Sequence, residues 1–148
     1  MKRSDRMAPV QQVLSDTEQA RARDLGAAQQ RLAEAEAKLG ELKNYHADYQ
    51  RAFLARGQQG HAVTALRDFQ AFLARLEEAL RQQDRAVVMA RDQVSLQRRN
   101  WQGAARQVKA VESVVQRWQN AEARAVDRRE QKETDERAQR SVSRGGLA

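Results

Sequence analysis

The chain has 148 residues, of which 32% are charged and only 5% aromatic, and its formal net charge is +7. It contains no cysteine, which excludes disulfide bonds, cysteine-ligated zinc and thiol catalysis. A composition rich in alanine, leucine, glutamate and arginine is typical of long helices and coiled coils. One proline and no isoleucine argue further against a sheet protein.

Hydropathy argues against a membrane protein. No apolar run approaches the roughly 18 residues of a transmembrane helix, and the first residues lack the apolar core of a signal peptide. We therefore expect a cytoplasmic protein without membrane insertion. The positive charge is compatible with an acidic protein, a nucleic acid or an anionic membrane surface, and it selects none of them.

The first predicted helix covers residues 9–56. Pro9 suits its first turn, where the missing N–H costs nothing. Apolar residues then recur in alternating steps of three and four, and His46 takes the one remaining slot. The apolar slots are Leu25, Ala28, Leu32, Ala35, Leu39, Leu42, Tyr49 and Phe53. Upstream valines fit this spacing less well, which suggests a stutter between Thr17 and Leu25.

A second helix is predicted over residues 61–138, after a tight turn at Gly57-Gln-Gln-Gly60. From Leu66 to Ala125 the same spacing continues without a change of phase, and fifteen of its eighteen slots are apolar. The three polar slots are Gln83, Gln97 and Glu122. Heptads sustained over this length indicate a coiled coil.

Two long helices joined by a short turn run antiparallel. The predicted fold is therefore all-α, a long antiparallel two-helix coiled-coil hairpin in which the second helix overhangs the first. Residues 1–140 form a single domain in this prediction, and residues 141–148, rich in Ser, Gly and Arg, form a disordered tail.

The unequal helix lengths predict an exposed surface. With the turn at residues 57–60, two residues that face each other across the hairpin have numbers that add up to about 117. Pro9, where the first helix begins, then lies opposite Val108, and the seam beyond Val108 has no partner within the chain. An unpartnered apolar stripe, with Trp118 at its middle, is by default a binding surface. Self-association of two such overhangs is the alternative. The predicted binding residues are Arg106, Lys109, Val111, Val115 and Trp118.

Motifs of catalysis are missing from the chain. It has no glycine-rich phosphate loop, no H-E-x-x-H and no G-x-S-x-G. A two-helix hairpin also offers no concave pocket in which carboxylates would be desolvated. His46 is interpreted as a polar core or tip residue in preference to a ligand or base. We expect no enzyme activity, no cofactor and no metal.

A basic stretch lies between Asp92 and Glu112, where the chain has no acidic residue and four positive charges, Arg98, Arg99, Arg106 and Lys109. It is either a solvated helix face or a contact for an acidic protein partner. The absence of exposed aromatic stacking residues argues against nucleic acid, because Trp101 lies on the seam.

Three segments together resemble the FliJ family of flagellar type III export proteins, whose injectisome relatives play the matching role. Each is weak alone, but their order and spacing extend over about residues 9–140 of a hairpin of this length. They read Leu39-x-x-Leu42-x-x-Tyr45-x-x-x-Tyr49 before the turn, Phe69-x-x-Phe72-Leu73-x-x-Leu76-x-x-Ala79-Leu80-x-x-Gln83 after it, and Glu130-Gln131-Lys132-Glu133-x-Asp135-Glu136 near the C-terminus.

The resemblance implies a non-enzymatic stalk in flagellum assembly and motility. The terminal end of the hairpin is expected to enter the central hole of the hexameric export ATPase, and the other end to meet the membrane export gate protein. The predicted ATPase-binding residues are those of the overhang, Arg106, Lys109, Val111, Val115 and Trp118. The chain would also bind and escort export chaperones. Its expected location is cytoplasmic and peripheral, at the cytoplasmic face of the inner membrane.

The resemblance also implies a patch of gate-binding residues near the turn. It maps onto Leu42, Tyr45, Tyr49, Phe72, Leu76 and Ala79. Two flanking positions depart from the family pattern, with Lys38 in place of Gln and Gln83 in place of His. Tyr45, Phe72 and Ala79 lie beside the seam, so they are the better candidates for exposure. The alternative function is a generic structural coiled-coil scaffold or a basic nucleoid-associated helical protein.

Overall fold

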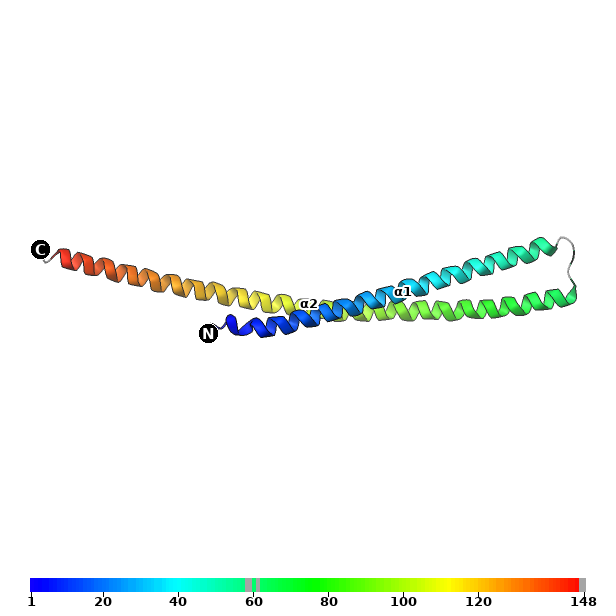
Figure 1. Cartoon of the computed structure of the whole chain (residues 1–148), viewed down its shortest axis with the longest axis horizontal. Coiled ribbons are helices and arrows are strands. Elements are labelled where there is room, and N and C mark those ends of the chain that lie inside the picture. Colours follow the sequence, from blue (N-terminus) through cyan, green and yellow to red (C-terminus); the bar gives the residue numbers. More distant parts are fainter. Residues whose placement is uncertain (58–59, 61, 147–148) are drawn as a thin grey trace. The chain divides into compact units, whose positions relative to one another are not determined.

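The computed structural model describes residues 1–57, 60 and 62–146. A short 3-10 helix, η1 (Asp5–Met7), leads into α1 (Ala8–Gly57), and α2 (Val63–Gly145) follows (Figure 1). The described residues contain no strand, and the two long helices pack against each other. The predicted fold class, an all-α two-helix hairpin, is confirmed.

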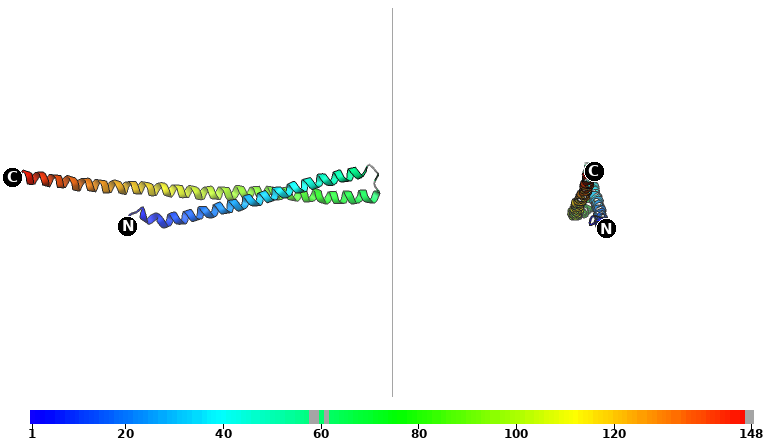
Figure 2. Two further views of the ribbon diagram at one scale, coloured as in Figure 1. Left: turned by 45° about the horizontal axis from the view of Figure 1, so that its top comes forward. Right: turned by 90° about the vertical axis from the view of Figure 1, so that its left-hand side faces the viewer.

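The chain divides into two packed units. One unit combines Met1–Gln19 with Gly103–Ala148, and the other is Ala20–Gln102. In each unit a segment of α1 lies beside a segment of α2 that runs in the opposite direction (Figure 2). Both units are segments of the same two helices, and the single domain predicted for residues 1–140 stays a prediction.

Contacts in the unit Ala20–Gln102 establish the antiparallel direction. The ring of Tyr45 lies 6.1 Å from that of Phe72, and further along Gln83 Nε2 donates a hydrogen bond of 2.9 Å to the carbonyl oxygen of Ala35. Positions on α2 therefore rise as positions on α1 fall. A side chain that reaches a carbonyl of the opposite helix also opposes slippage between the two.

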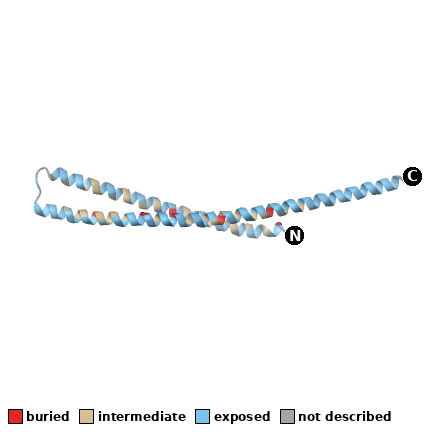
Figure 3. Cartoon of the chain, turned by 180° about the vertical axis from the view of Figure 1, so that it is seen from behind, coloured by how far each residue is buried: buried red, intermediate tan, exposed pale blue. Residues whose placement is uncertain are grey.

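The seam forms the core of both units (Figure 3). Every predicted slot from Leu25 to Phe53 and from Phe69 to Glu122 is buried or half-buried, whereas Leu66 and Ala125 at the two ends are exposed. The most buried apolar residues are small or medium in size and all occupy these slots. They are Ala28, Leu76, Val87, Val94, Ala104 and Val115.

The predicted stutter near the start of α1 is wrong. The buried or half-buried residues Ser4, Met7, Leu14 and Glu18 continue the steps of three and four that lead to Leu25, although the slot before Leu25 is exposed. Val10 and Val13, by contrast, point to solvent. The register of the seam is continuous, but polar residues fill several of its slots. The nearby valines lie outside those slots, and for this reason the sequence pattern suggested a change of phase.

The ends of the helices differ from prediction by a few residues. α1 ends at Gly57 and α2 begins at Val63, against the predicted 56 and 61. Gly60 has a φ of 82°, which favours glycine, and its N–H donates a 3.1 Å hydrogen bond to the carbonyl oxygen of Gly57. The two glutamines between these glycines lie outside the described residues.

At its C-terminus α2 continues to Gly145, past the predicted end at 138. The disordered tail predicted for residues 141–148 is therefore wrong over 141–145. Residues 147 and 148 lie outside the described part of the chain. Only the last few residues carry the glycines that suggested disorder, and the preceding Ser, Val and Arg residues are compatible with a helix.

Two adjacent valines test whether the seam stabilises the fold. Val87 is 3% exposed on the seam, and Val88 is 54% exposed on another face of α2. Val87→Ala removes two buried carbons, and each contributes roughly 0.8 kcal/mol to stability. Because alanine has the better helix propensity, part of this loss is offset, and the free energy of unfolding should fall by about 1 kcal/mol. Val88→Ala should leave it unchanged or slightly higher. Urea unfolding followed by circular dichroism measures both, and equal effects would contradict the assigned seam.

Candidate interaction surfaces

All five tyrosines and phenylalanines of the chain gather in one aromatic cluster near the turn, within the unit Ala20–Gln102. Phe53 and Phe69 stack with their ring centroids 3.7 Å apart and an interplanar angle of 8°. Tyr49 lies 4.5 Å from Phe72 and 5.2 Å from Phe69, and Tyr45 meets Phe72 edge to face. Such pairs contribute roughly 0.5–1.5 kcal/mol each beyond the area that they bury, so the cluster holds the two helices together there.

The residues of the implied gate-binding patch differ in accessibility. Tyr45 is 52% exposed, whereas Leu76 is 6% exposed and belongs to the core. The other four, Leu42, Tyr49, Phe72 and Ala79, are half-buried. Of the three residues expected to be exposed, only Tyr45 is so. Phe72 and Ala79 are partly covered, because the aromatic cluster and the α1 side chains extend over the flank of the seam.

His46 lies on the seam close to this cluster. Its Nε2 atom is 3.6 Å from Glu77 Oε1, and its side chain is mostly covered. This position agrees with the interpretation of His46 as a polar core residue. Among the described residues no group of histidine, aspartate and glutamate side chains could hold a metal ion.

The N-terminal segment, residues 2–7, packs on α2 in the unit Met1–Gln19 with Gly103–Ala148. The backbone N–H of Ser4 donates a 3.2 Å hydrogen bond to Glu122 Oε1, and its hydroxyl donates one of 2.6 Å to Oε2. The guanidinium of Arg3 lies 4.0 Å from the ring centroid of Trp118, a cation–π contact. Ser4 is only 5% exposed as a result.

The predicted exposed stripe around Trp118 is therefore wrong. Val115 is 5% exposed, and Val111 and Trp118 are half-buried. Val111 borders the first turns of α1, and residues 1–7, which fold into a turn and the 3-10 helix η1, extend the intrachain cover from there as far as Glu122. Arg106 and Lys109 are exposed as expected. Binding of an ATPase by these five residues stays a prediction.

The free part of α2 begins after Glu122. Residues 123–146 are exposed throughout, and acidic and basic side chains are mixed along them (Figure 3). A helix that is polar on all sides gains little from packing within its own chain. The overhang thus presents a charged surface, whereas the predicted apolar stripe lies before it and is covered.

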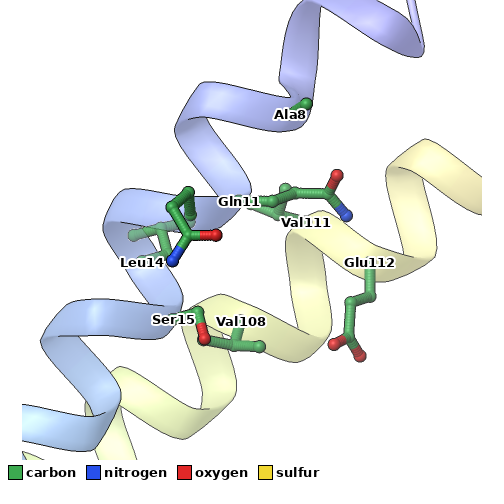
Figure 4. A pocket seen from close by; sticks show the side chains of 8 residues that line it. Ala8, Gln11, Leu14, Ser15, Val108, Val111 and Glu112 are labelled. Atoms are coloured by element: carbon green, nitrogen blue, oxygen red, sulfur yellow. The ribbon is translucent and has the colours of Figure 1, made fainter.

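Behind the N-terminal segment, the packing of α1 on α2 contains a hollow of about 330 Å³ (Figure 4). Four small or polar side chains and one leucine of α1, with two valines and a glutamate of α2, surround it. The lining residues are Ala8, Gln11, Gln12, Leu14, Ser15, Val108, Val111 and Glu112. Leu14 is the main apolar side chain that the first two turns of α1 bring to this stretch, because the other lining residues of α1 are small or polar.

Glu122 is the charged group on which the N-terminal segment depends. The hydrogen bond from the Ser4 hydroxyl lowers the pKa of the Glu122 carboxyl below its ordinary value of 4.5. Partial desolvation raises this pKa, and the positive charges of Lys2 and Arg3 lower it further. Sequence reasoning missed this contact. Its signal was present, since Ser4 continues the 3,4 spacing backwards from Leu25 and Glu122 occupies a slot of the second seam.

Comparison with protein families assigns the chain. Residues 2–147 match the family described as flagellar FliJ protein, so the chain belongs to the FliJ family. Comparisons with curated proteins and with solved structures give no match. The family is a structural export component and not a family of enzymes, and its members work in the flagellar export machinery. No helix among the described residues is long and apolar enough to cross a membrane.

The lowered pKa of Glu122 predicts a pH-dependent contribution to stability. Because its pKa in the folded chain lies below 4.5, the contact with Ser4 stabilises the fold above that pH and is lost as the pH falls through the lowered value. The melting temperature of the unmodified chain should therefore exceed that of Glu122→Gln at pH 6, and the two should converge at strongly acidic pH. A difference that is constant from pH 6 downwards would contradict the assignment.

Proposed function

We propose that this chain is a non-enzymatic stalk that couples the hexameric flagellar export ATPase to the membrane export gate during flagellum assembly. Membership of the FliJ family supports the flagellar export setting. The observation that carries the finer proposal is the difference between the two packed units. One bears the aromatic cluster with Tyr45 exposed, and the other bears an exposed, charged overhang of α2.

The gate-binding surface is assigned to the unit Ala20–Gln102. Tyr45 presents half of its side chain to solvent and is supported from behind by Tyr49 and Phe72. A rigid, partly exposed aromatic residue is the type that dominates binding energy at protein interfaces. Leu42, Tyr49, Phe72, Leu76 and Ala79 then act mainly by holding Tyr45 in place, since they are half-buried or buried.

The ATPase-binding surface is assigned to the overhang, residues 123–145, together with Arg106 and Lys109. These residues are exposed, and the basic pair lies in a stretch that contains no acid before Glu112. Exposed charges on an elongated helix suit association with a ring whose inner surface carries complementary charge. The ATPase can contact Val111, Val115 and Trp118 only where the N-terminal segment leaves them uncovered.

The remaining parts of the proposal follow from the resemblance to the family. The chain binds and escorts export chaperones, and it works as a peripheral component at the cytoplasmic face of the inner membrane, in support of motility. It needs no cofactor and no metal. It stimulates the ATPase without binding a nucleotide itself.

One experiment with separate variants tests this assignment. Tyr45→Ala should weaken binding to the export gate protein by about 10-fold or more, as expected of an interface hot spot, and leave binding to the export ATPase unchanged. The double variant Arg106→Ala with Lys109→Ala should weaken binding to the export ATPase and leave binding to the export gate protein unchanged. Calorimetry with the purified gate protein and ATPase of the same cell measures both affinities.

Leu54→Ala is the matched control for Tyr45, because Leu54 is more exposed and lies on the same helix. Arg23→Ala with Lys38→Ala removes the same two charges from exposed positions of α1. If each control weakened binding as much as its counterpart, or if neither partner bound the unmodified chain, the proposed function would be wrong.

A further inference from the structure

The apolar stripe of α2 near its overhang is covered in part by residues 2–7, in which Met7 is half-buried in a seam slot and two residues make polar contacts. Ser4 contributes two hydrogen bonds, both to the carboxylate of Glu122. Arg3 contributes its contact with the indole of Trp118. Charged contacts of this kind, made near the surface, are weakened by salt.

The packing next to the cover is loose. The first two turns of α1 border the hollow of about 330 Å³, and Val10 and Val13 point to solvent instead of to α2. A missing neighbour on one side of a side chain forfeits its dispersion contacts there. Leu14 is the half-buried apolar residue of these turns, and the segment before them is held by Arg3, Ser4 and the half-buried Met7.

The covered residues are of the type that binds other helices. Trp118 is half-buried beneath Arg3 of the N-terminal segment, Val115 is buried one turn before it, and both lie just before the exposed overhang. Without the cover, they would form an apolar stripe with a tryptophan at its end, continuous with the overhang on the same helix. Such a stripe, rimmed by polar residues, fits an apolar helix face of a partner protein.

We propose that residues 2–7 act as a detachable, autoinhibitory cover over Trp118, next to the buried Val115. In the free chain the cover keeps the stripe from aggregation or premature binding. When the overhang engages its partner, the segment detaches and the stripe joins the interface. The inference rests on the proposed function for the identity of that partner, the export ATPase, whereas the detachment itself is a property of this chain alone.

Fluorine NMR on the full chain labelled with 5-fluorotryptophan can measure detachment directly. The chain has two tryptophans, and Trp101→Phe assigns the two signals. Replacing Arg3 and Ser4 together by alanine should move the Trp118 signal towards its position in the unfolded chain and leave the Trp101 signal in place. Glu122→Gln, which keeps residues 1–7 intact, should move it in the same direction.

Arg6→Ala is the matched control. Arg6 belongs to the same segment, and its removal takes away the same charge as removal of Arg3. Its hydrogen bond is to the carbonyl oxygen of Met1, whereas Arg3 lies over the ring of Trp118. The control should leave the Trp118 signal unchanged. An unmoved Trp118 signal in both the double variant and Glu122→Gln would overturn the proposal.

The affinity for the export ATPase tests the autoinhibition. If the detached, binding-competent state makes up about 1–10% of the free chain, the apparent affinity for the ATPase falls to that fraction of its intrinsic value. The double variant should therefore bind the ATPase about 10- to 100-fold more tightly than the Arg6→Ala control. A displaced Trp118 signal with unchanged or weaker ATPase affinity would overturn autoinhibition and leave the proposed function standing. Absence of ATPase binding by every chain, the unmodified one included, would overturn the proposed function and the autoinhibition with it.

Discussion

The burial of one continuous apolar seam on α2 against α1 is the constraint on which the rest of the structure depends. Neither helix has a second layer to pack on, so nearly all apolar burial follows the 3,4 spacing of residues such as Val87 and Val94. Helical hydrogen bonds alone would not select one arrangement of two long helices, because they are satisfied within each helix. The seam, together with the hydrogen bond from Gln83 to the carbonyl of Ala35, sets direction and register. The exposed surfaces of the hairpin are defined by what the seam leaves uncovered.

The fold was predictable from the sequence because its signal is periodic and long. Fifteen apolar slots in phase on the second helix, and a pair of glycines before them, leave few alternatives to an antiparallel hairpin. The aromatic cluster was predictable only in part. The spacing places Tyr49 and Phe69 on the seam, but the partial burial of Phe72 depends on how Tyr45 and Tyr49 lie against it, and no periodic rule contains that information.

The covered state of Trp118 could not be derived from the length of the hairpin. A constant sum of about 117 for facing residues would place Ser4 opposite residue 113, whereas Ser4 reaches Glu122 and the two numbers add up to 126. That contact depends on a single hydroxyl, one carboxylate and a 3-10 turn, and such local polar contacts carry a weak signal in a helical sequence. The same cause explains the mistaken stutter, because Ser4, Gln11 and Glu18 occupy seam slots where apolar residues were expected.

The closed hairpin within one chain is the central claim, and chemical cross-linking tests it most directly. The chain has no native cysteine, so Ala28→Cys with Ala90→Cys introduces the sole pair, and both positions line one small hollow between α1 and α2. A short bismaleimide linker at low protein concentration should give a cross-linked monomer of changed electrophoretic mobility. Ala33→Cys with Ala90→Cys, in which Ala33 is exposed on α1, should react far less. Cross-links that form only between two copies, or equally in both variants, would contradict the intrachain seam.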